Sequence, residues 1–187
     1  RIGPSDSVPI SRRYLPGTNV VETDWATASG WLVVRDALAI GPWREDRIDT
    51  HARTPTDMDA RHMLVRHVTC LGGEVEVELV CNLMDDYGRR RAEWSLRENR
   101  LVADTELANG LDLRLMSDVR LGIDQGTATG RHWLREGESC FAALSWDEPL
   151  ADPETAEEAL EEIRVTERFW RRWLSNGNFP DHPWRVH

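Results

Sequence analysis

The chain has 187 residues, of which 40% are hydrophobic and 30% are charged, and its formal net charge at pH 7 is −10. This length suits one domain, or one domain with an appendage, and is enough to bury a core. The acidic balance argues against broad binding to nucleic-acid phosphates, which needs clustered cationic side chains. No apolar run approaches the roughly 20 residues that a membrane-spanning helix needs. We therefore expect no membrane partner and, from the charge, no nucleic-acid partner.

The basic residues and the cysteines narrow the chemistry further. All 23 basic residues are arginine, so the chain has no lysine that could form a Schiff base or bind nucleotide phosphates in a P-loop. The three cysteines, Cys70, Cys81 and Cys140, are odd in number, widely spaced and without a CxxC pair. We therefore predict free thiols and a cytoplasmic location. A disulfide between Cys70 and Cys81 across a hairpin is the less favoured alternative.

Alternation of apolar and polar residues marks the first strands. A Pro-Gly turn leads into a strand over 20–25, and a second strand over 30–40 completes a hairpin. Residues 44–60 lack any periodicity and predict a long surface loop.

The same pattern continues to residue 146. It predicts a hairpin over 62–83, a second hairpin over 92–107, an alternating segment over 111–123 and a pair of strands over 131–146. Their turns are predicted at Gly72-Gly73, Glu98-Asn99 and Glu136-Gly137. Turn signals that recur every 8 to 12 residues or so are typical of an all-β sandwich or barrel. We expect antiparallel strands throughout 11–148, with no helix longer than two turns among them.

The pattern changes to a helical one near residue 152. Asp152 is predicted to cap a helix whose first position is Pro153, and Asn176-Gly177 is predicted to end it. Leu160, Ile163, Trp170 and Leu174 recur at spacings near 3.6 residues and are predicted to pack on the strands. About 23 residues would make a rod of roughly 35 Å.

Acidic residues are the first candidates for catalysis. Glu74, Glu76 and Glu78 share one strand face, for which a solvated outer face is favoured over an active site. Asp85-Asp86 precedes Tyr-Gly and favours a turn.

Asp36 is the acidic residue with the most unusual predicted position. It shares strand parity with Leu32, Val34, Leu38 and Ile40, so it is predicted to point towards the core. We expect it to be largely buried and hydrogen-bonded to an arginine or to backbone N–H groups, because a buried carboxylate needs such partners. Structural anchoring is favoured over catalysis, since no partner acid or base is visible.

The histidines and tryptophans complete the list of candidates. His62 and His67 are five residues apart on a predicted strand, so they should face opposite sides and share no metal ion. His132 adjoins Trp133 and is expected to be packed or exposed. The nine tryptophans could stack on sugar rings, but core and interface positions are favoured. We thus predict no catalytic residue, no cofactor-binding residue, no cofactor and no metal ligand in this chain.

Four segments occur in a characteristic order: 11–25, 30–41, 73–94 and 166–185. Their most specific parts are Tyr-Leu-Pro-Gly-Thr at 14–18 and Phe-Trp-Arg-Arg-Trp-Leu at 169–174. In this order the segments resemble the N-terminal domain of bacterial trehalase and glucoamylase-type enzymes in glycoside hydrolase family fifteen. This resemblance implies a supersandwich-like antiparallel β-sandwich, joined by a helical linker to a catalytic (α/α)₆ barrel that hydrolyses α-glucosidic bonds with inversion. The barrel supplies both catalytic carboxylates in that family, so none is transferred to this chain.

The resemblance also sets the expected organisation. We expect a sandwich domain over 1–151, preceded in the family by further strands, and a linker helix and tail over 152–187 that lead to the barrel. The expected partners are that barrel and, through it, a glucan or disaccharide. Phe169, Trp173 and Trp184 are predicted to form a surplus aromatic face that is buried against the barrel in the intact enzyme. In this chain alone we expect that face to be exposed, covered by a second copy, or disordered from about Asn176 onward. A free-standing carbohydrate-binding module and an oligomerisation or interaction domain are the alternatives.

Overall fold

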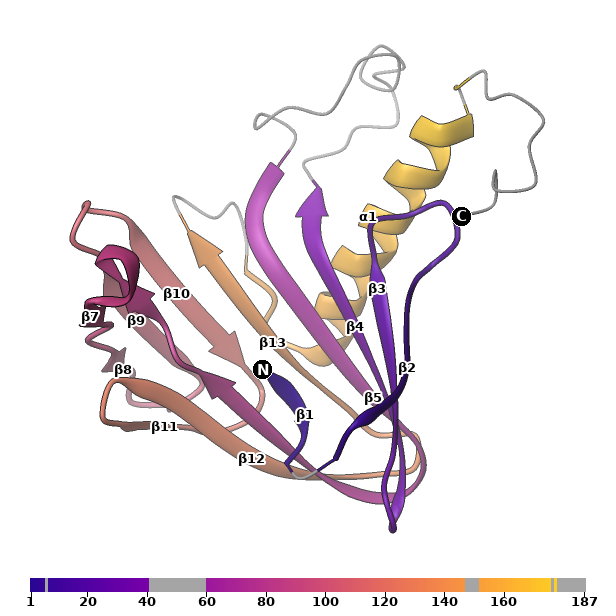
Figure 1. Cartoon of the computed structure of the whole chain (residues 1–187), viewed down its shortest axis with the longest axis horizontal. Coiled ribbons are helices and arrows are strands. Elements are labelled where there is room, and N and C mark those ends of the chain that lie inside the picture. The colour runs from indigo at the N-terminus through magenta and orange to yellow at the C-terminus, as the bar shows by residue number, and fades with distance from the viewer. Residues whose placement is uncertain (6, 41–59, 147–151, 176, 178–187) are drawn as a thin grey trace.

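The fold consists of antiparallel strands and one C-terminal helix (Figure 1). A computed structural model describes residues 1–5, 7–40, 60–146, 152–175 and 177. The predicted loop at 44–60 therefore lies outside the described residues except for Ala60, and so does Trp184 in the tail. Within the described residues, the longest helix before residue 147 has three residues, as the strand-rich pattern predicted.

Eleven strands form one continuous hydrogen-bonded sheet that folds over into two layers. The first layer has the order β2-β3-β4-β5-β13-β10-β9-β8, and the second consists of β1, β5, β12 and β11. Every pairing between these strands is antiparallel. The strands are β1 (Ile2–Pro4), β2 (Pro9–Tyr14), β3 (Val21–Ala26), β4 (Gly30–Ile40), β5 (Ala60–Cys81), β8 (Ser95–Leu96), β9 (Val102–Glu106), β10 (Asp112–Ser117), β11 (Leu121–Asp124), β12 (Thr127–Arg135) and β13 (Ser139–Trp146); a separate two-stranded ribbon holds β6 (Met84–Asp85) and β7 (Arg90–Arg91).

Strand β5 connects the two layers, and the predicted hairpin at Gly72-Gly73 is wrong. Residues 60–81 form a single strand of 22 residues. Its first half pairs with β4 and β13, and its second half pairs with β1 and β12. Gly73 has a φ of +74°, and a Cβ there would lie 2.0 Å from the Ser29 carbonyl oxygen. The two glycines bend the strand from one layer to the other instead of reversing it.

The turn at Glu136-Gly137 also leads from one layer to the other. Strands β12 and β13 flank the turn as predicted, but they do not pair with each other. Each instead pairs with one half of β5. The predicted hairpin over 92–107 is confirmed by the pairing of β8 with β9, whereas the segment over 111–123 contains two strands, β10 and β11. The chain is thus a large antiparallel β-sandwich, as expected.

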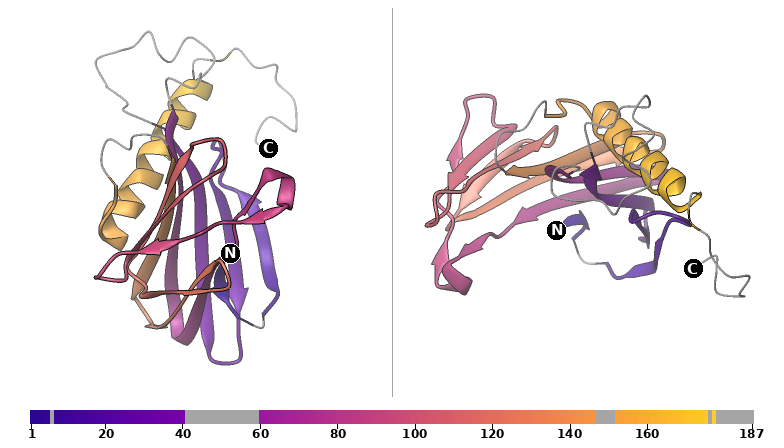
Figure 2. Two further views of the ribbon diagram at one scale, coloured as in Figure 1. Left: turned by 90° about the vertical axis from the view of Figure 1, so that its left-hand side faces the viewer. Right: turned by 90° about the horizontal axis from the view of Figure 1, so that it is seen from above.

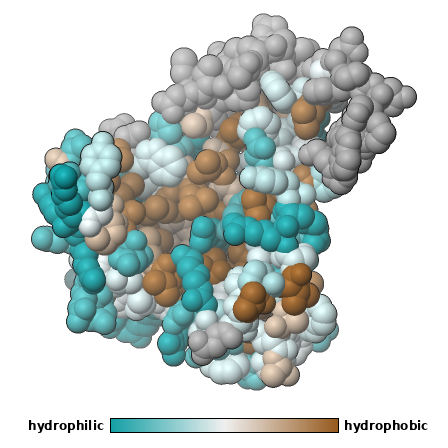
Figure 3. Space-filling view, viewed as in Figure 1, coloured by the Kyte–Doolittle hydropathy of each residue, from teal (hydrophilic) through white to brown (hydrophobic). Residues whose placement is uncertain are grey.

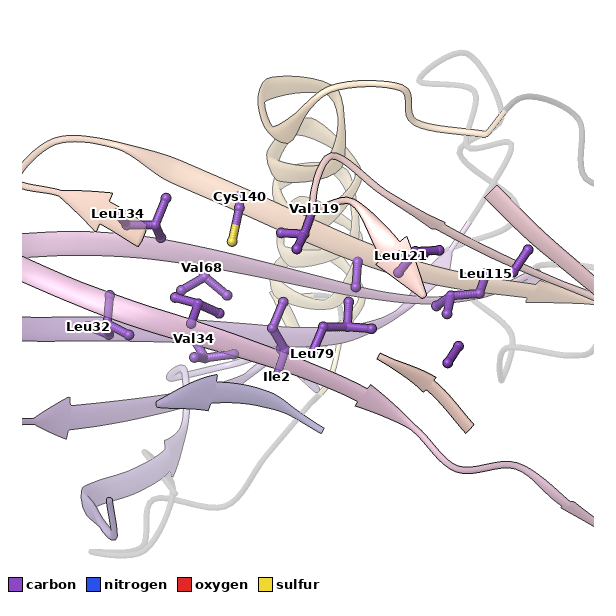
Figure 4. Close-up of a cluster of buried hydrophobic side chains, with 14 of the residues drawn as sticks. Ile2, Leu32, Val34, Val68, Leu79, Leu115, Val119, Leu121, Leu134 and Cys140 are labelled. Carbon is purple, nitrogen blue, oxygen red and sulfur yellow. The ribbon is translucent and has the colours of Figure 1, made fainter. Parts of the chain in front are cut away.

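Two apolar clusters lie on opposite faces of the first layer. Alternate residues of β13 divide between them, because successive side chains of a strand point to opposite faces. Cys140 belongs to the cluster between the layers, which Figure 4 shows together with Leu32, Val34 and Val68. Phe141 belongs to the cluster on the other face, beneath the helix. Figure 2 shows the helix lying across that outer face.

Helix α1 (Ala156–Ser175) begins later than predicted, so the assignment of Asp152 as its cap is wrong. The Glu158 backbone N–H donates to Thr155 Oγ1 at 3.2 Å, and the Thr155 N–H donates to Glu158 Oε2 at 3.3 Å. This is a capping box, which satisfies N–H groups at the helix start. Asp152 instead lies 3.4 Å from Arg114 Nη1. The predicted end is confirmed by a hydrogen bond from Gly177 N–H to the Leu174 carbonyl at 3.0 Å.

The buried stripe of α1 also differs from the predicted one. Ile163 is fully buried as expected, but Leu160, Trp170 and Leu174 are only partly buried. The buried residues are Ala159, Ile163, Thr166 and Phe169. Small Ala159 and Thr166 let the helix approach the sheet closely, and Thr166 Oγ1 accepts a hydrogen bond from the Ile40 N–H at 3.2 Å.

Candidate functional site

Asp36 lies on the inner face of β4 and contacts an arginine. Its side chain is 16% exposed, and its Oδ1 lies 3.2 Å from Arg66 Nε on β5. This confirms the predicted arginine partner, although these two atoms form an ion pair and not a hydrogen bond. Burial raises the pKa of Asp36, and the charge of Arg66 offsets part of that rise. Asp36 anchors two neighbouring strands to each other.

The inner face does not stay buried along all of β4. Leu32 and Val34 are 1% and 3% exposed, as predicted, but Leu38 is 63% exposed. The two layers diverge at that end of the strands (Figure 1). Figure 3 shows apolar side chains gathered in the hollow between the layers. A pocket of about 130 Å³ opens there and is lined by Leu64, Leu79 and Leu115 among others.

The glutamate row and the aspartate pair have structural roles, as the sequence favoured. Glu74 and Glu78 pair across β5 and β12 with Arg135 at 3.3 Å and Arg131 at 2.9 Å. Asp85 Oδ2 and Oδ1 accept backbone hydrogen bonds from Ala108 and Asp86, both at 2.7 Å, and these bonds lower the pKa of Asp85. The aspartate pair thus fixes a turn.

The histidines lie apart from one another. His67 is buried on the helix side of β5, where burial lowers its pKa to about 4. His62 stacks on Trp146 at a ring-centroid distance of 6.0 Å, and His132 is exposed. Among the described residues, no three side chains of His, Cys, Asp or Glu converge as metal ligands would. Cys70, Cys81 and Cys140 are free thiols, as predicted.

One groove is lined by four carboxylates and two arginines, which makes it a candidate for a pair of catalytic carboxylates. It has a volume of about 870 Å³, lies at β9 and β10, and is lined by Asp104 and by the exposed Glu93, Glu106 and Asp112. Burial alone would raise the pKa of Asp104, but hydrogen bonds from Arg114 at 2.7 Å and Arg97 at 2.9 Å outweigh it and lower the pKa. A general acid needs the opposite, a carboxyl kept protonated by an apolar site.

The two sequence segments that carry the resemblance contact each other, which sequence reasoning did not foresee. Residues 14–18 form a turn in which Gly17 has a φ of +70°, and the Thr18 N–H donates to the Leu15 carbonyl at 3.1 Å. A Cβ at Gly17 would lie 3.6 Å from Arg171 Cγ and 3.7 Å from Leu174 Cδ1 of α1. Proline followed by a glycine with positive φ is what a type II turn requires. The turn and the C-terminal end of α1 therefore form one corner of the molecule.

Two tryptophans lie on the partly exposed side of this corner. Trp170 and Trp173 meet edge to face with ring centroids 6.0 Å apart, and Phe169 packs edge to face on Trp170 at 5.4 Å. The buried Trp170 Nε1 has no hydrogen-bond partner. Phe169 is only 1% exposed, so its predicted place in a surplus aromatic face is wrong, because it belongs to the core beneath α1. Trp173 is partly exposed.

The sequence is similar to that of two trehalases. No family model matches the chain. A trehalase of Mycolicibacterium smegmatis and a trehalase of Mycobacterium tuberculosis are each 44% identical to it over an alignment of 195 residues, which covers the whole chain. The chain resembles one segment of bacterial trehalases. It spans 29% and 28% of the length of these two relatives, and the resemblance predicted from the four ordered segments is confirmed.

The fold aligns with a putative kojibiose phosphorylase from the human microbiome at 9% identity and a TM-score of 0.41, covering 83% of this chain and 22% of the other. The described part of the chain contains no helix that is both long enough and apolar enough to cross a bilayer.

Proposed function

We propose that this chain is a non-catalytic β-sandwich domain of a trehalase-like or glucoamylase-like glycoside hydrolase that acts on α-glucosidic bonds. Similarity to two trehalases over the whole chain, but over less than a third of their length, is the observation that carries this proposal. In the parent protein, residues 1–151 would form the sandwich and residues 152–187 the linker to a catalytic (α/α)₆ barrel. The three free thiols suit a cytoplasmic enzyme.

The chemistry of the described residues supports the proposed non-catalytic role. An inverting glycosidase needs one protonated and one ionised carboxyl about 6.5–9.5 Å apart across a pocket. Asp36 is paired with Arg66, and Asp104 is paired with both Arg97 and Arg114. Carboxylates held in such ion pairs anchor the sheet and are poorly placed to exchange protons with a substrate.

The supporting role rests on the corner that joins the 14–18 turn to α1. Trp170 and Trp173 present partly exposed, adjoining aromatic rings there, and aromatic side chains of this kind are enriched where one protein surface contacts another. In the parent protein the barrel would cover this corner, and the glucan or disaccharide that is hydrolysed would bind to the barrel.

The test compares the parent protein with the isolated chain. The parent should release glucose from trehalose or maltose, whereas the purified 187-residue chain should release none from either sugar. The non-catalytic reading would be overturned by turnover in the isolated chain that a single carboxylate substitution, such as Asp36→Asn or Asp104→Asn, abolishes. A parent protein that is inactive on every α-glucoside would contradict the assignment to this enzyme class.

The carbohydrate-binding alternative finds less support. Such a module needs a row of exposed aromatic rings on one sheet face. Trp31 and Trp133 are 54% and 53% exposed, but they lie on β4 and β12, which belong to different layers.

A further inference from the structure

A groove at the turn between β12 and β13 holds an exposed tryptophan among polar side chains. The groove has a volume of about 460 Å³, which lies within the range usual for small-molecule sites. Its tryptophan is Trp133, which is 53% exposed. The polar residues that line the groove with it are Glu74, His132, Arg135, Glu138 and Ser139. We call this hollow the Trp133 groove.

Hydrogen bonds fix the turn that forms one wall of the groove. The Glu136 N–H donates to the Gly73 carbonyl at the bend of β5, at 3.0 Å, and the Glu138 N–H donates to the Arg135 carbonyl at 2.9 Å. The Arg135 N–H in turn donates to Glu138 Oε2 at 2.8 Å. Arg135 and Glu138 are therefore positioned before any ligand binds, which reduces the entropy that binding costs.

Several polar groups of the groove still have hydrogen-bonding capacity. Arg135 Nε donates to Glu74 Oε1 at 3.3 Å, and the two Nη groups of the same guanidinium extend beyond this contact as further donors. Glu138 binds the backbone through Oε2, so its other oxygen can accept a hydrogen bond. Within the part of the chain that the structure describes, neither the His132 ring nor the Trp133 indole N–H makes a hydrogen bond. Donors and acceptors thus surround one flat aromatic ring.

We propose that the Trp133 groove binds the pyranose ring of a neutral sugar. The faces of a glucose ring carry C–H groups, which pack on the electron-rich face of an indole ring. Its hydroxyl groups both donate and accept hydrogen bonds, so Arg135 can donate to them and Glu138 can accept from them. This combination of an exposed aromatic ring and fixed polar groups carries the proposal.

The charge of the groove and its single large ring argue against other ligand classes. Glu74 and Glu138 outnumber Arg135, so an anion would be repelled. A quaternary ammonium ion is recognised by a cage of aromatic rings, and Trp133 is the one tryptophan, tyrosine or phenylalanine among the described residues that line the groove. The choice of a glucoside as the sugar rests on the proposed function, but the groove lies on the sandwich and is separate from the substrate site in the barrel.

Nuclear magnetic resonance of the nitrogen-labelled 187-residue chain tests the proposal. The indole N–H signal of Trp133 is identified by its absence from Trp133→Ala. We expect maltotetraose or trehalose to shift this signal at millimolar concentration. Sorbitol, which has the hydroxyl groups of a sugar but no ring, should leave it unchanged. Trp133→Ala should weaken sugar binding about tenfold or more, measured on the backbone amide signals of residues 134–139, because it removes the surface on which the sugar ring packs.

Trp31→Ala is the matched control. Trp31 is 54% exposed, nearly as much as Trp133, but its cross-strand neighbours Ala26 and Gly72 carry no hydrogen-bonding side chain. Its loss should change sugar binding less than about twofold, as expected for a distant and independent position.

Three outcomes would overturn the proposal. In the first, neither sugar shifts the Trp133 signal at millimolar concentration, or sorbitol shifts it equally. In the second, Trp31→Ala weakens binding as much as Trp133→Ala. In the third, the sugar no longer shifts the signal in the parent protein, because another domain would then cover the groove. A parent protein that is inactive on every α-glucoside, while the isolated chain still binds maltotetraose, would contradict the proposed function and leave this site standing.

Discussion

His67 and Asp36 are buried on opposite faces of the first layer, His67 more deeply than Asp36. Burial shifts the pKa of each side chain. Asp36 keeps a charged partner on the inner face, 3.2 Å away. His67, on the outer face, is 4% exposed beneath α1, and its Nδ1 lies 3.4 Å from Thr69 Oγ1. Burial lowers the pKa of His67 to about 4, and the positive charge of Arg35 acts in the same direction. The folded protein therefore keeps His67 neutral at pH values where an exposed histidine is charged.

This environment predicts a stability loss in mild acid. The unfolded chain binds a proton at His67 near the ordinary pKa of 6.5, and the folded chain does so only near 4. The contribution of neutral His67 to the free energy of unfolding is thus fully present above about pH 6.5. It falls as the pH decreases towards 4, by up to about 3 kcal/mol. Urea unfolding of the wild type and of His67→Gln between pH 7 and pH 4.5 measures this loss of stability. The variant should lose less stability over this range, and parallel curves for the two proteins would contradict the assignment.

At the scale of elements, the long strand β5 determines the architecture. It pairs with β4 and β13 in one layer and with β1 and β12 in the other. The bend at Gly72-Gly73 lies against Gly30 and the Ser29 carbonyl. Both layers therefore depend on a close backbone approach that only glycine permits.

Substitution of Gly73 by alanine should be much more damaging than the same change at Gly137. Both glycines have positive φ, +74° and +83°, so both substitutions carry a backbone cost of about 1–2 kcal/mol. A Cβ at Gly137 meets nothing within 4 Å, whereas at Gly73 it would lie 2.0 Å from a carbonyl oxygen. We expect Gly73→Ala to cost at least about 2 kcal/mol more than Gly137→Ala, measured by urea unfolding. Equal losses would show that the bend is not closely packed.

The bend of β5 and the start of α1 could not be predicted from local sequence, for physical reasons. Alternation and turn residues identified the strands, but a glycine pair is compatible with both a hairpin and a bend, and only pairing partners distant in sequence distinguish them. Asp152 and Pro153 carry the local signals of a helix start, yet Thr155 and Glu158 form the capping box. The Asp36–Arg66 pair was predictable in kind, because a carboxylate on a buried face needs a partner. The contact between the 14–18 turn and α1 was not predictable, because the two segments are far apart in sequence and meet only through tertiary structure.

The sandwich buries one side of α1 but covers its C-terminal end only in part. The helix packs through Ile163 and Phe169 on the outer face of the first layer, while its C-terminal end meets the 14–18 turn. Trp173 lies on the partly exposed side of that end. The helix thus packs on the sandwich over most of its length, and under the proposed function its C-terminal end also contacts the barrel.

Two substitutions one turn apart separate the buried part of α1 from its partly exposed C-terminal end. Phe169→Ala opens a cavity in the core and should cost about 3–5 kcal/mol in the isolated chain. Trp173→Ser removes a partly exposed ring and should cost less than about 1 kcal/mol there. In the parent protein, Trp173→Ser should uncouple the unfolding of the sandwich from that of the barrel, and calorimetry would then record two transitions in place of one. If the isolated chain self-associates in sedimentation experiments, the same variant should make it monomeric. A large stability loss for Trp173→Ser in the isolated chain, with unchanged unfolding of the parent, would assign Trp173 to the sandwich core and exclude this docking face.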